Sequence, residues 1–297
     1  MKVAFLINKS SGSSDTDEGL KSLIQSRISN TDFESYFIDC CNSDSEKQIN
    51  DLINDELDIL VASGGDGTIN SAASKIIDKN ISLGILPSGT LNHFAKDLNI
   101  PNDIEQAINV ILKGNKIKVD VGEVNGLIFL NNSSIGFYPK VVKKRDKHLE
   151  RLGGNKWIAM FKSIINVFKN YKLLKVEIKT EEKSHEITTP FVFIGNNEYQ
   201  MNLLNLGKRK SLTNGHLSLY YGKAHGKFSV IWFTFLGLLN KLDQNKDFII
   251  EMTDEVIIDI NKKIIEVSRD GEVDHLQSPL VYKIRPKSLS VIVPEVE

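Results

Sequence analysis

Short apolar segments followed by loops rich in glycine and serine recur through the N-terminal third of this chain. Val3–Ile7 precedes Asn8-Lys9-Ser10-Ser11-Gly12, Asp58–Ala62 precedes Ser63-Gly64-Gly65-Asp66-Gly67-Thr68, and Ile81–Leu86 precedes Pro87-Ser88-Gly89-Thr90. Continuous apolar runs bounded by turn residues are typical of buried parallel strands. Helical patterns accompany them at residues 17–29, 45–56, 68–79 and 102–113. Because strand–helix alternation builds a parallel sheet with right-handed crossovers, we expect all three loops at one edge, where open α/β sheets bind ligands.

The pattern changes after residue 120, where strand-like segments follow one another with few helices between them. They are Val119–Val124, Leu127–Asn131, Leu174–Lys179, Ile187–Ile194, His216–Tyr221, Val256–Ile260, Lys263–Val267, Leu280–Ile284 and Leu289–Val293. Two helical stretches interrupt this series, near residues 138–172 and 227–241. Many strands without intervening helices predict an antiparallel sheet or sandwich. We therefore expect two domains, residues 1–122 and 123–297, with about the last ten residues packing back on the first.

Composition excludes several classes of protein. The chain has 297 residues, with 37 Lys+Arg against 38 Asp+Glu, which argues against an unfolded chain or a dedicated nucleic-acid binder. Its two cysteines, Cys40 and Cys41, are adjacent and cannot build a disulfide framework. The apolar stretch Phe228–Leu239 is shorter than the ~20 residues needed to span a bilayer. These features predict a soluble cytoplasmic protein.

The segment Gly64-Gly65-Asp66-Gly67-Thr68 carries the clearest chemical signal. Glycines let the backbone approach a phosphate closely, and the helix that follows offers free N–H groups and a positive dipole end. Asp66 would repel phosphate unless a cation lay between them, so it is a candidate for organising magnesium and a nucleotide. A tight structural turn is the alternative interpretation of this pattern.

Two further segments are weaker signals when taken alone. In the stretch Pro87 to Lys96, Thr90 and Asn92 could hydrogen-bond phosphate or ribose, or the stretch could simply begin a helix. Far along the chain, Ser268-Arg269-Asp270-Gly271-Glu272 ends a predicted strand with two carboxylates around a glycine. A phosphoryl acceptor needs a base within hydrogen-bond reach, although a plain Asp-Gly hairpin turn gives the same pattern.

Together these motifs resemble the diacylglycerol kinase catalytic-domain superfamily, which includes sphingosine and ceramide kinases, and in particular its bacterial soluble lipid kinases. The resemblance runs over nearly the whole chain and rests on an ordered set of motifs. They are Asn8-x-x-Ser11-Gly12, GGDGT at 64–68, GTLNHFAKDLNIP at 89–101, Ser134-Ile135-Gly136-Phe137, Gly195-Asn196-Asn197, DGE at 270–272 and Ile284-Arg285-Pro286-x-x-Leu289.

The resemblance implies a three-layer α/β nucleotide-binding domain with a parallel sheet, followed by an antiparallel β-sandwich that takes the lipid, with the active site between them. It implies ATP and Mg²⁺ as cofactors, and residues that hold the nucleotide: Asn8, Gly64, Gly65, Asp66, Gly67, Thr68, Asn70, Thr90, Asn92 and His93. Glu272 would be the catalytic base, with Asp270 beside it, and Asp66 would hold the metal. In some members the aspartate of the glycine-rich loop is described as the base, so Asp66 and Glu272 could exchange roles.

Two departures from the family pattern concern charge. Many relatives have Asp where this chain has His93, and an imidazole cannot replace a magnesium-linked carboxylate directly. A structural magnesium site of some relatives uses an Asp-Gly pair where this chain has Asn214-Gly215, and the Asn214 amide supplies no charge. We therefore do not expect that second metal site here.

The expected activity is transfer of the ATP γ-phosphoryl group to a lipid hydroxyl, with a diacylglycerol-type acceptor as the default. A kinase of a water-soluble acceptor, similar to NAD kinase, and a non-catalytic regulator that binds nucleotide or lipid are the alternatives. Basic residues are in excess over 140–183, and Trp157 lies among them, so peripheral contact with a membrane surface is expected. No nucleic-acid partner is expected, and a homodimer is compatible with the sequence.

Overall fold

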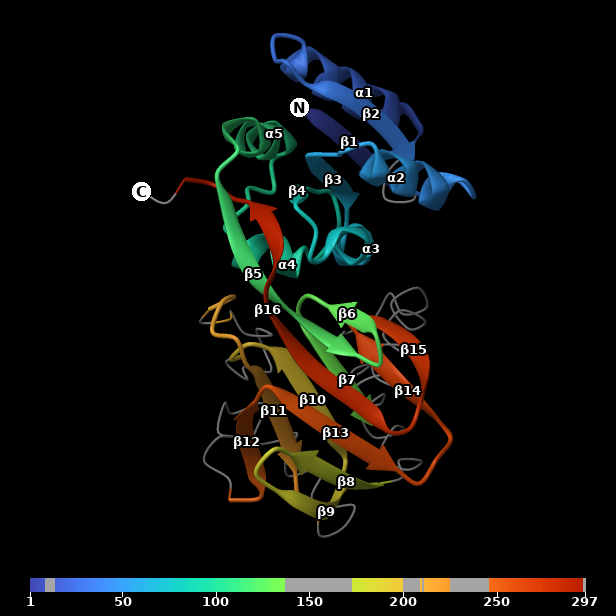
Figure 1. Ribbon diagram of the computed structural model, residues 1–297, viewed down its shortest axis with the longest axis vertical. Helices are drawn as coiled ribbons and strands as arrows, with labels where there is room; N and C mark the ends of the chain where they lie inside the picture. The colour runs from blue at the N-terminus through green and yellow to red at the C-terminus, as the bar shows by residue number, and fades with distance from the viewer. Residues whose placement is uncertain (9–13, 137–172, 200–208, 210, 225–245, 296–297) are drawn as a thin grey trace, which may run out of the picture. The chain divides into compact units, whose positions relative to one another are not determined.

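A computed structural model describes residues 1–8, 14–136, 173–199, 209, 211–224 and 246–295 (Figure 1). The described chain divides into two compact units. The first comprises Met1–Val121 and Pro286–Glu297, and the second comprises Gly122–Arg285. The predicted helices near 138–172 and 227–241, together with the predicted membrane-contact residues on them, lie outside the described residues.

The first unit contains a parallel sheet in the order β2-β1-β3-β4, with the end of β16 added beside β4. These strands are β1 (Lys2–Ile7), β2 (Glu34–Asp39), β3 (Ile59–Gly64), β4 (Ser82–Pro87) and β16 (Leu280–Ile292). Every residue of β3 and β4 is buried, as the continuous apolar runs predict. All four pairings within this set are parallel, so the strand ends that precede the three predicted loops lie at one edge of the sheet.

Helices cover both faces of this sheet, which gives the three layers expected. They are α1 (Ser14–Ile28), α2 (Ser45–Asn54), α3 (Asp66–Ile76), α4 (His93–Asp97) and α5 (Ile104–Lys113). An ion pair between Arg27 and Glu105 joins α1 to α5, and an ion pair between Lys75 and Glu46 joins α3 to α2. In α5, Asp103 accepts a hydrogen bond from the Gln106 N–H, a capping contact that starts the helix.

The second unit is built from antiparallel strands. One sheet has the order β12-β11-β10-β7-β14-β15, and the other joins the first half of β16 to β13, β8 and β9, with β5 and β6 beside it. The strands not yet given are β5 (Lys116–Val124), β6 (Leu127–Phe129), β7 (Asn132–Gly136), β8 (Leu174–Thr180), β9 (Ser184–Thr189), β10 (Phe191–Asn196), β11 (Leu217–Gly222), β12 (Phe248–Thr253), β13 (Glu255–Ile260), β14 (Ile264–Arg269) and β15 (Glu272–Gln277).

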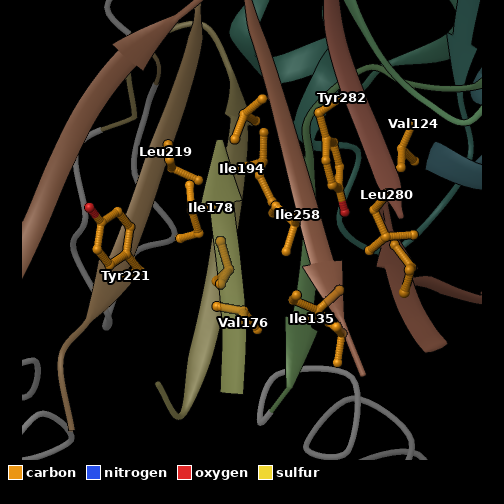
Figure 2. Close-up of a cluster of buried hydrophobic side chains, with 14 of the residues drawn as sticks. Val124, Ile135, Val176, Ile178, Ile194, Leu219, Tyr221, Ile258, Leu280 and Tyr282 are labelled. Atoms are coloured by element: carbon orange, nitrogen blue, oxygen red, sulfur yellow. The ribbon is translucent and has the colours of Figure 1, made fainter. Parts of the chain in front are cut away.

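The core of the second unit fills the space between these two sheets. Figure 2 shows Ile135, Ile194 and Leu219 from the six-stranded sheet facing Ile178 and Ile258 from the other. All five side chains are buried in one apolar cluster. Alternation along each strand directs apolar residues inward from both sheets, which is the packing of an antiparallel β-sandwich.

Several strand predictions were wrong at prolines and polar segments. The single strand predicted over Ile187–Ile194 is two, because Pro190, which has no N–H to donate, separates β9 from β10. Conversely, the two strands predicted at Leu280–Ile284 and Leu289–Val293 are one strand, β16, which pairs with β13 before Pro286 and with β4 after it. The patterns also missed β2, β7, β12 and β15.

None of the helices within the described residues is both long and apolar enough to cross a bilayer.

Candidate active site

Three parallel strands of the first unit, β1, β3 and β4, end side by side at the carboxyl edge of the sheet. The Asn8 N–H donates to the Ser63 carbonyl over 3.0 Å, so the end of β1 is fixed beside β3. The Ser88 N–H donates to the Gly64 carbonyl over 3.1 Å, which fixes the end of β4 beside β3 in turn. These backbone hydrogen bonds therefore hold the carboxyl ends of the three strands side by side.

Glycines at this edge allow approaches that no other residue would permit. A Cβ on Gly89 would lie 2.4 Å from the Gly65 Cα and 2.7 Å from the Asn92 Oδ1. A Cβ on Gly64 would lie 2.4 Å from the Thr68 Oγ1. The loops after β3 and β4 are thus in backbone contact, and the sequence requires glycine there for a packing reason as well as for ligand approach.

Asn8 and Thr68 connect the first loop to the helix that follows β3. The Asn8 Nδ2 donates to the Thr68 Oγ1 over 3.0 Å, and Thr68 is buried in the first turn of α3. Gly65 precedes this helix with an extended backbone and supplies no side-chain cap. The first N–H groups of α3 are therefore available to an anion at this edge of the sheet.

Asp66 links α3 to the short helix α4. Its Oδ2 accepts a hydrogen bond from the His93 N–H and its Oδ1 accepts one from the Phe94 N–H, each over 3.3 Å. The Asp66 carboxylate therefore caps α4 and favours the N-terminal end of that helix electrostatically. A carboxylate has about four acceptor positions, so these two hydrogen bonds leave room for a cation.

Asn92 adopts a left-handed backbone conformation, with φ of 50°, at the entrance to α4. Its Nδ2 donates to the Gly89 carbonyl over 2.9 Å, but its buried Oδ1 has no hydrogen-bond partner. A buried acceptor without a donor is costly unless a ligand or water supplies one. The Asn92 Oδ1 is thus available to accept a hydrogen bond from a ligand at this edge of the sheet.

The remaining nucleotide-binding residues predicted from the sequence lie in the same loops. Gly67 and Asn70 belong to the first turns of α3, Thr90 is exposed in the loop after β4, and the half-buried His93 begins α4. The structure therefore gathers the whole predicted set of the first unit, from Asn8 to His93, into one place.

In the second unit, Asp270 and Gly271 form the two-residue turn between β14 and β15. Both have positive φ, 46° and 91°, as a tight hairpin turn of this type requires. The Asp270 carboxylate accepts three backbone N–H hydrogen bonds, from Leu130 over 2.7 Å, Asn131 over 2.8 Å and Asn132 over 3.0 Å. Asp270 is thereby tied to the segment between β6 and β7, which orients the hairpin.

Two polar side chains, those of Arg209 and Asn196, also donate hydrogen bonds to this segment. The Arg209 guanidinium donates to the Leu130 carbonyl over 2.5 Å and to the Asn131 Oδ1 over 3.1 Å. The Asn196 Nδ2 donates to the same Leu130 carbonyl over 2.9 Å. A positive group and a negative group therefore act on opposite ends of the peptide unit between Leu130 and Asn131, and each strengthens the other's hydrogen bond.

Glu272, the residue next to this turn, is exposed at the start of β15. Its backbone position is fixed by pairing with Arg269, whose Nε donates to the Asp274 Oδ2 over 2.7 Å. The two carboxylates of the DGE motif therefore differ: Asp270 is engaged by the backbone, and Glu272 faces solvent.

Sequence reasoning missed two groups of residues beside these sites. Arg209 lies in a basic run, Lys208 to Lys210, and nothing in that run indicates which residue is buried. Cys40 and Cys41 follow β2, whose moderately polar sequence did not predict a strand. Recognition of β2 would have placed both cysteines at the same edge as Asn8, because β2 is parallel to β1.

The N-terminal part of the chain is similar in sequence to a known protein family. Residues 2–124 match the family model of the diacylglycerol kinase catalytic domain. Over these residues, which are less than half of the chain, the sequence is similar to that family. Diacylglycerol kinases of Staphylococcus aureus strains JH9 and Newman are each 38% identical over 104 residues, or 34% of this chain and 33% of the relative. The match therefore spans about a third of the length of these curated relatives.

Solved structures resemble the chain over a greater length. A crystal structure of a proposed diacylglycerol kinase from Bacillus anthracis strain Sterne aligns with a TM-score of 0.74 and 22% identity, over 99% of this chain and 97% of that one. A second crystal structure of a diacylglycerol kinase from this strain aligns with a TM-score of 0.69 and 19% identity, with the same coverage. At these identities the likeness is one of fold.

Proposed function

We propose that this protein transfers the γ-phosphoryl group of ATP to the hydroxyl group of a lipid, with diacylglycerol as the first candidate acceptor. The observation that carries the proposal is the edge of the parallel sheet, where glycine contacts and uncapped helix N–H groups form a cradle for phosphate. The similarity of residues 2–124 to the diacylglycerol kinase catalytic domain supports the acceptor class. Peripheral attachment to a membrane from the cytoplasm would bring the protein to such an acceptor.

The residues of the first unit fit a nucleotide with Mg²⁺. Glycine at positions 64 and 89 lets the loops pack closely, because the space that a Cβ would fill is taken by the Thr68 side chain at Gly64 and by the Gly65 Cα at Gly89. The buried Asn92 Oδ1 has no hydrogen-bond partner and can accept from a ribose hydroxyl or a metal-bound water. Asp66 would hold Mg²⁺ through its remaining acceptor positions, and Thr90 is exposed for contact with phosphate. Bound Mg²⁺ would offset the negative charge that the phosphates carry.

The chain's own residues then have distinct roles in this proposal. Asn8 orients the Thr68 hydroxyl, and Asp66 fixes the start of α4 so that His93 is presented beside the phosphates. Glu272 accepts the proton of the lipid hydroxyl as that oxygen attacks phosphorus. Asp270 does not take that proton in our proposal: it positions Glu272 by holding the hairpin turn to the backbone of residues 130–132.

The test is phosphoryl transfer from labelled ATP to a panel of lipids in mixed micelles with Mg²⁺. We expect a labelled phospholipid with the unmodified protein and a turnover lowered by about 10²–10⁴-fold in Glu272→Gln, because the base is lost while the fold is retained. Glu181→Gln is the matched control, since Glu181 is an exposed carboxylate in the turn between β8 and β9. It should leave turnover unchanged.

Other outcomes would replace the proposal. Labelled NADP or a sugar phosphate in place of lipid would indicate a kinase of a water-soluble acceptor. Retained ATP binding without any product across the panel would indicate a binding protein silenced around His93. Full turnover of Glu272→Gln would remove Glu272 as the base and favour Asp66, which Asp66→Asn would then test.

A further inference from the structure

Three consecutive residues with metal-ligand side chains lie at the end of the edge strand β2. Asp39 is the last residue of that strand, and Cys40 and Cys41 follow it in a turn. One oxygen of the Asp39 carboxylate and the two sulfur atoms all lie within 4.8 Å of one another. The two Sγ atoms are 3.8 Å apart, and both thiols are free.

This spacing suits coordination and not a disulfide. A disulfide requires an S–S distance of about 2.05 Å. Two thiolates that bind one tetrahedral zinc ion, each with a Zn–S bond of about 2.3 Å, lie about 3.8 Å from each other. The observed separation of the Cys40 and Cys41 sulfur atoms equals the second value. Little movement is therefore needed for both sulfur atoms to bind one ion.

The backbone around the three residues is held by hydrogen bonds. The Cys40 N–H donates to the Ile7 carbonyl at the end of β1 over 3.0 Å, and the Cys41 N–H donates to the Asp39 Oδ1 over 3.0 Å. Cys41 is exposed and Cys40 is half-buried, so an ion can enter from solvent. The ligands are thus partly ordered before an ion arrives, which reduces the entropy lost on binding.

We propose that Asp39, Cys40 and Cys41 form a binding site for a thiophilic divalent cation of the zinc class. Both thiols lose their protons to solvent as the sulfur atoms coordinate, and no electrons are transferred. Two thiolates and one carboxylate bring three negative charges to the ion, which favours zinc over magnesium because sulfur is a soft ligand. Three protein ligands leave a fourth position for water.

The site adjoins the loops described above through Asn8. The Cys41 Sγ lies 3.9 Å from the Asn8 Oδ1, to which the thiol donates, and the Asn8 Nδ2 donates to the Thr68 Oγ1. Coordination removes the thiol proton and therefore one of the hydrogen bonds of the Asn8 amide, the one to its Oδ1. Bound zinc should then weaken nucleotide binding, a consequence that rests on the proposed function, whereas the ion site itself does not.

The experiment is a titration of the purified, reduced protein with Zn²⁺ and, separately, with Cd²⁺ in the absence of nucleotide. Because the chain has two cysteines, any thiolate-to-cadmium charge-transfer absorption in the ultraviolet must come from this pair. We expect one ion per chain, protection of both thiols from alkylation, and affinity lowered by more than about tenfold in Cys40→Ser and in Cys41→Ser. Asp39→Asn should also weaken binding, while Asp44→Asn, at an exposed carboxylate nearby, should not.

Three results would overturn the site. The first is unchanged alkylation of the thiols with zinc present, and the second is equal zinc affinity in the double serine variant. The third is one ion for every two chains with dimerisation, because the exposed thiols would then bridge molecules. The coupling has its own readout, the dissociation constant of ATP with and without one equivalent of Zn²⁺. If zinc binds but this constant is unchanged, the site stands and the link through Asn8 fails.

Discussion

The two carboxylates of the Asp270-Gly271-Glu272 turn show how neighbouring side chains of the same chemistry take different roles. Asp270 accepts three backbone N–H hydrogen bonds, whereas Glu272 is exposed. A carboxylate held by three donors contributes to the order of the chain around it. An exposed carboxylate at a rigid turn is available to a substrate. Replacement of Asp270 should therefore lower mainly the stability of the protein, and replacement of Glu272 should lower mainly its activity.

Replacement of Asp270 by Asn should lower stability. The amide keeps the size of the side chain but replaces one carboxylate oxygen with a donor that faces backbone N–H groups, and charge-assisted bonds are lost. We expect a loss of about 1–3 kcal/mol in the free energy of unfolding, measured by urea denaturation. Glu272→Gln is the control, expected within about 0.5 kcal/mol of the unmodified protein. Equal losses in both variants would contradict the division of roles.

Cys40 should react slowly at neutral pH. Burial raises the pKa of its thiol to about 11, so the reactive thiolate is a small fraction of the population near pH 7. In Cys41→Ser, where Cys40 is the sole thiol, the contribution of Cys41 to this pKa is lost but burial remains, so the rate of alkylation should still rise about tenfold per pH unit up to and beyond pH 9. Mass spectrometry after timed quenching measures this rate. A plateau below pH 9 would contradict the effect of burial.

The loops between strands and helices form the next level of organisation. The loops after β3 and β4 pass close to each other, and glycine at position 89 allows it, because a Cβ there would lie 2.4 Å from the Gly65 Cα. By contrast, Gly19, in α1, has no atom within 4 Å of the position that a Cβ would take. The same residue type is therefore essential in one element and unfavourable in another.

Alanine substitution at Gly89 and at Gly19 should have opposite effects on stability. Gly89→Ala places a methyl group against the Gly65 backbone, and we expect a loss of about 1–3 kcal/mol in stability together with weaker ATP binding. Gly19→Ala should raise stability by about 0.5–1 kcal/mol, because alanine loses less conformational entropy in a helix. Thermal denaturation and nucleotide titration of both variants measure the effects. Destabilisation by Gly19→Ala would show that its surroundings are not open.

Two long strands, β5 and β16, contribute residues to both units of the molecule. The last part of β16 completes the parallel sheet of the first unit through the pairs Ser290 with Ser82 and Val291 with Leu83. Leu289 is fully buried there, although it lies far from β4 in the sequence. The N-terminal unit is therefore not formed by N-terminal sequence alone.

Truncation of Leu289 to Ala should destabilise the first unit. We expect a loss of about 2–5 kcal/mol, as for other large-to-small changes in a core. Hydrogen exchange should then become faster in β4, which pairs with this strand, and in β3 on the other side of β4. Ile117→Ala, at a partly exposed position of β5, should have a smaller effect. Unchanged protection of β4 in Leu289→Ala would contradict the role of β16 in that sheet.

Local sequence patterns predicted most of the first unit but fewer strands of the second. Strands such as β3 and β4 are apolar throughout, and their signal does not depend on a partner. By contrast, β15 alternates exposed and half-buried residues, and β7 contains two serines, so neither has a strong apolar period. Such strands form because neighbouring strands satisfy their backbone hydrogen bonds, which a local pattern does not record.

The residues of the candidate site likewise divide into those that local patterns predicted and those that they did not. Asn8, Asp66 and Asn92 were predicted because each follows or lies near a buried strand, and parallel strands bring their carboxyl ends together. The buried Arg209 and the thiol of Cys41 beside Asn8 were not predicted. Their positions depend on contacts between segments that no short motif links.

The amino-acid sequence therefore determined the order of buried strands, the strand ends that must gather at one edge, and the resemblance of the N-terminal part to diacylglycerol kinase catalytic domains. Tertiary structure decided which carboxylate of the DGE motif is held by the backbone, which strand completes the parallel sheet, and which thiol lies beside Asn8. The physical reason is the range of the interactions. Hydrophobic periodicity and turn propensity act over a few residues, whereas the contacts of Asp270, Leu289 and Cys41 join residues far apart in the chain.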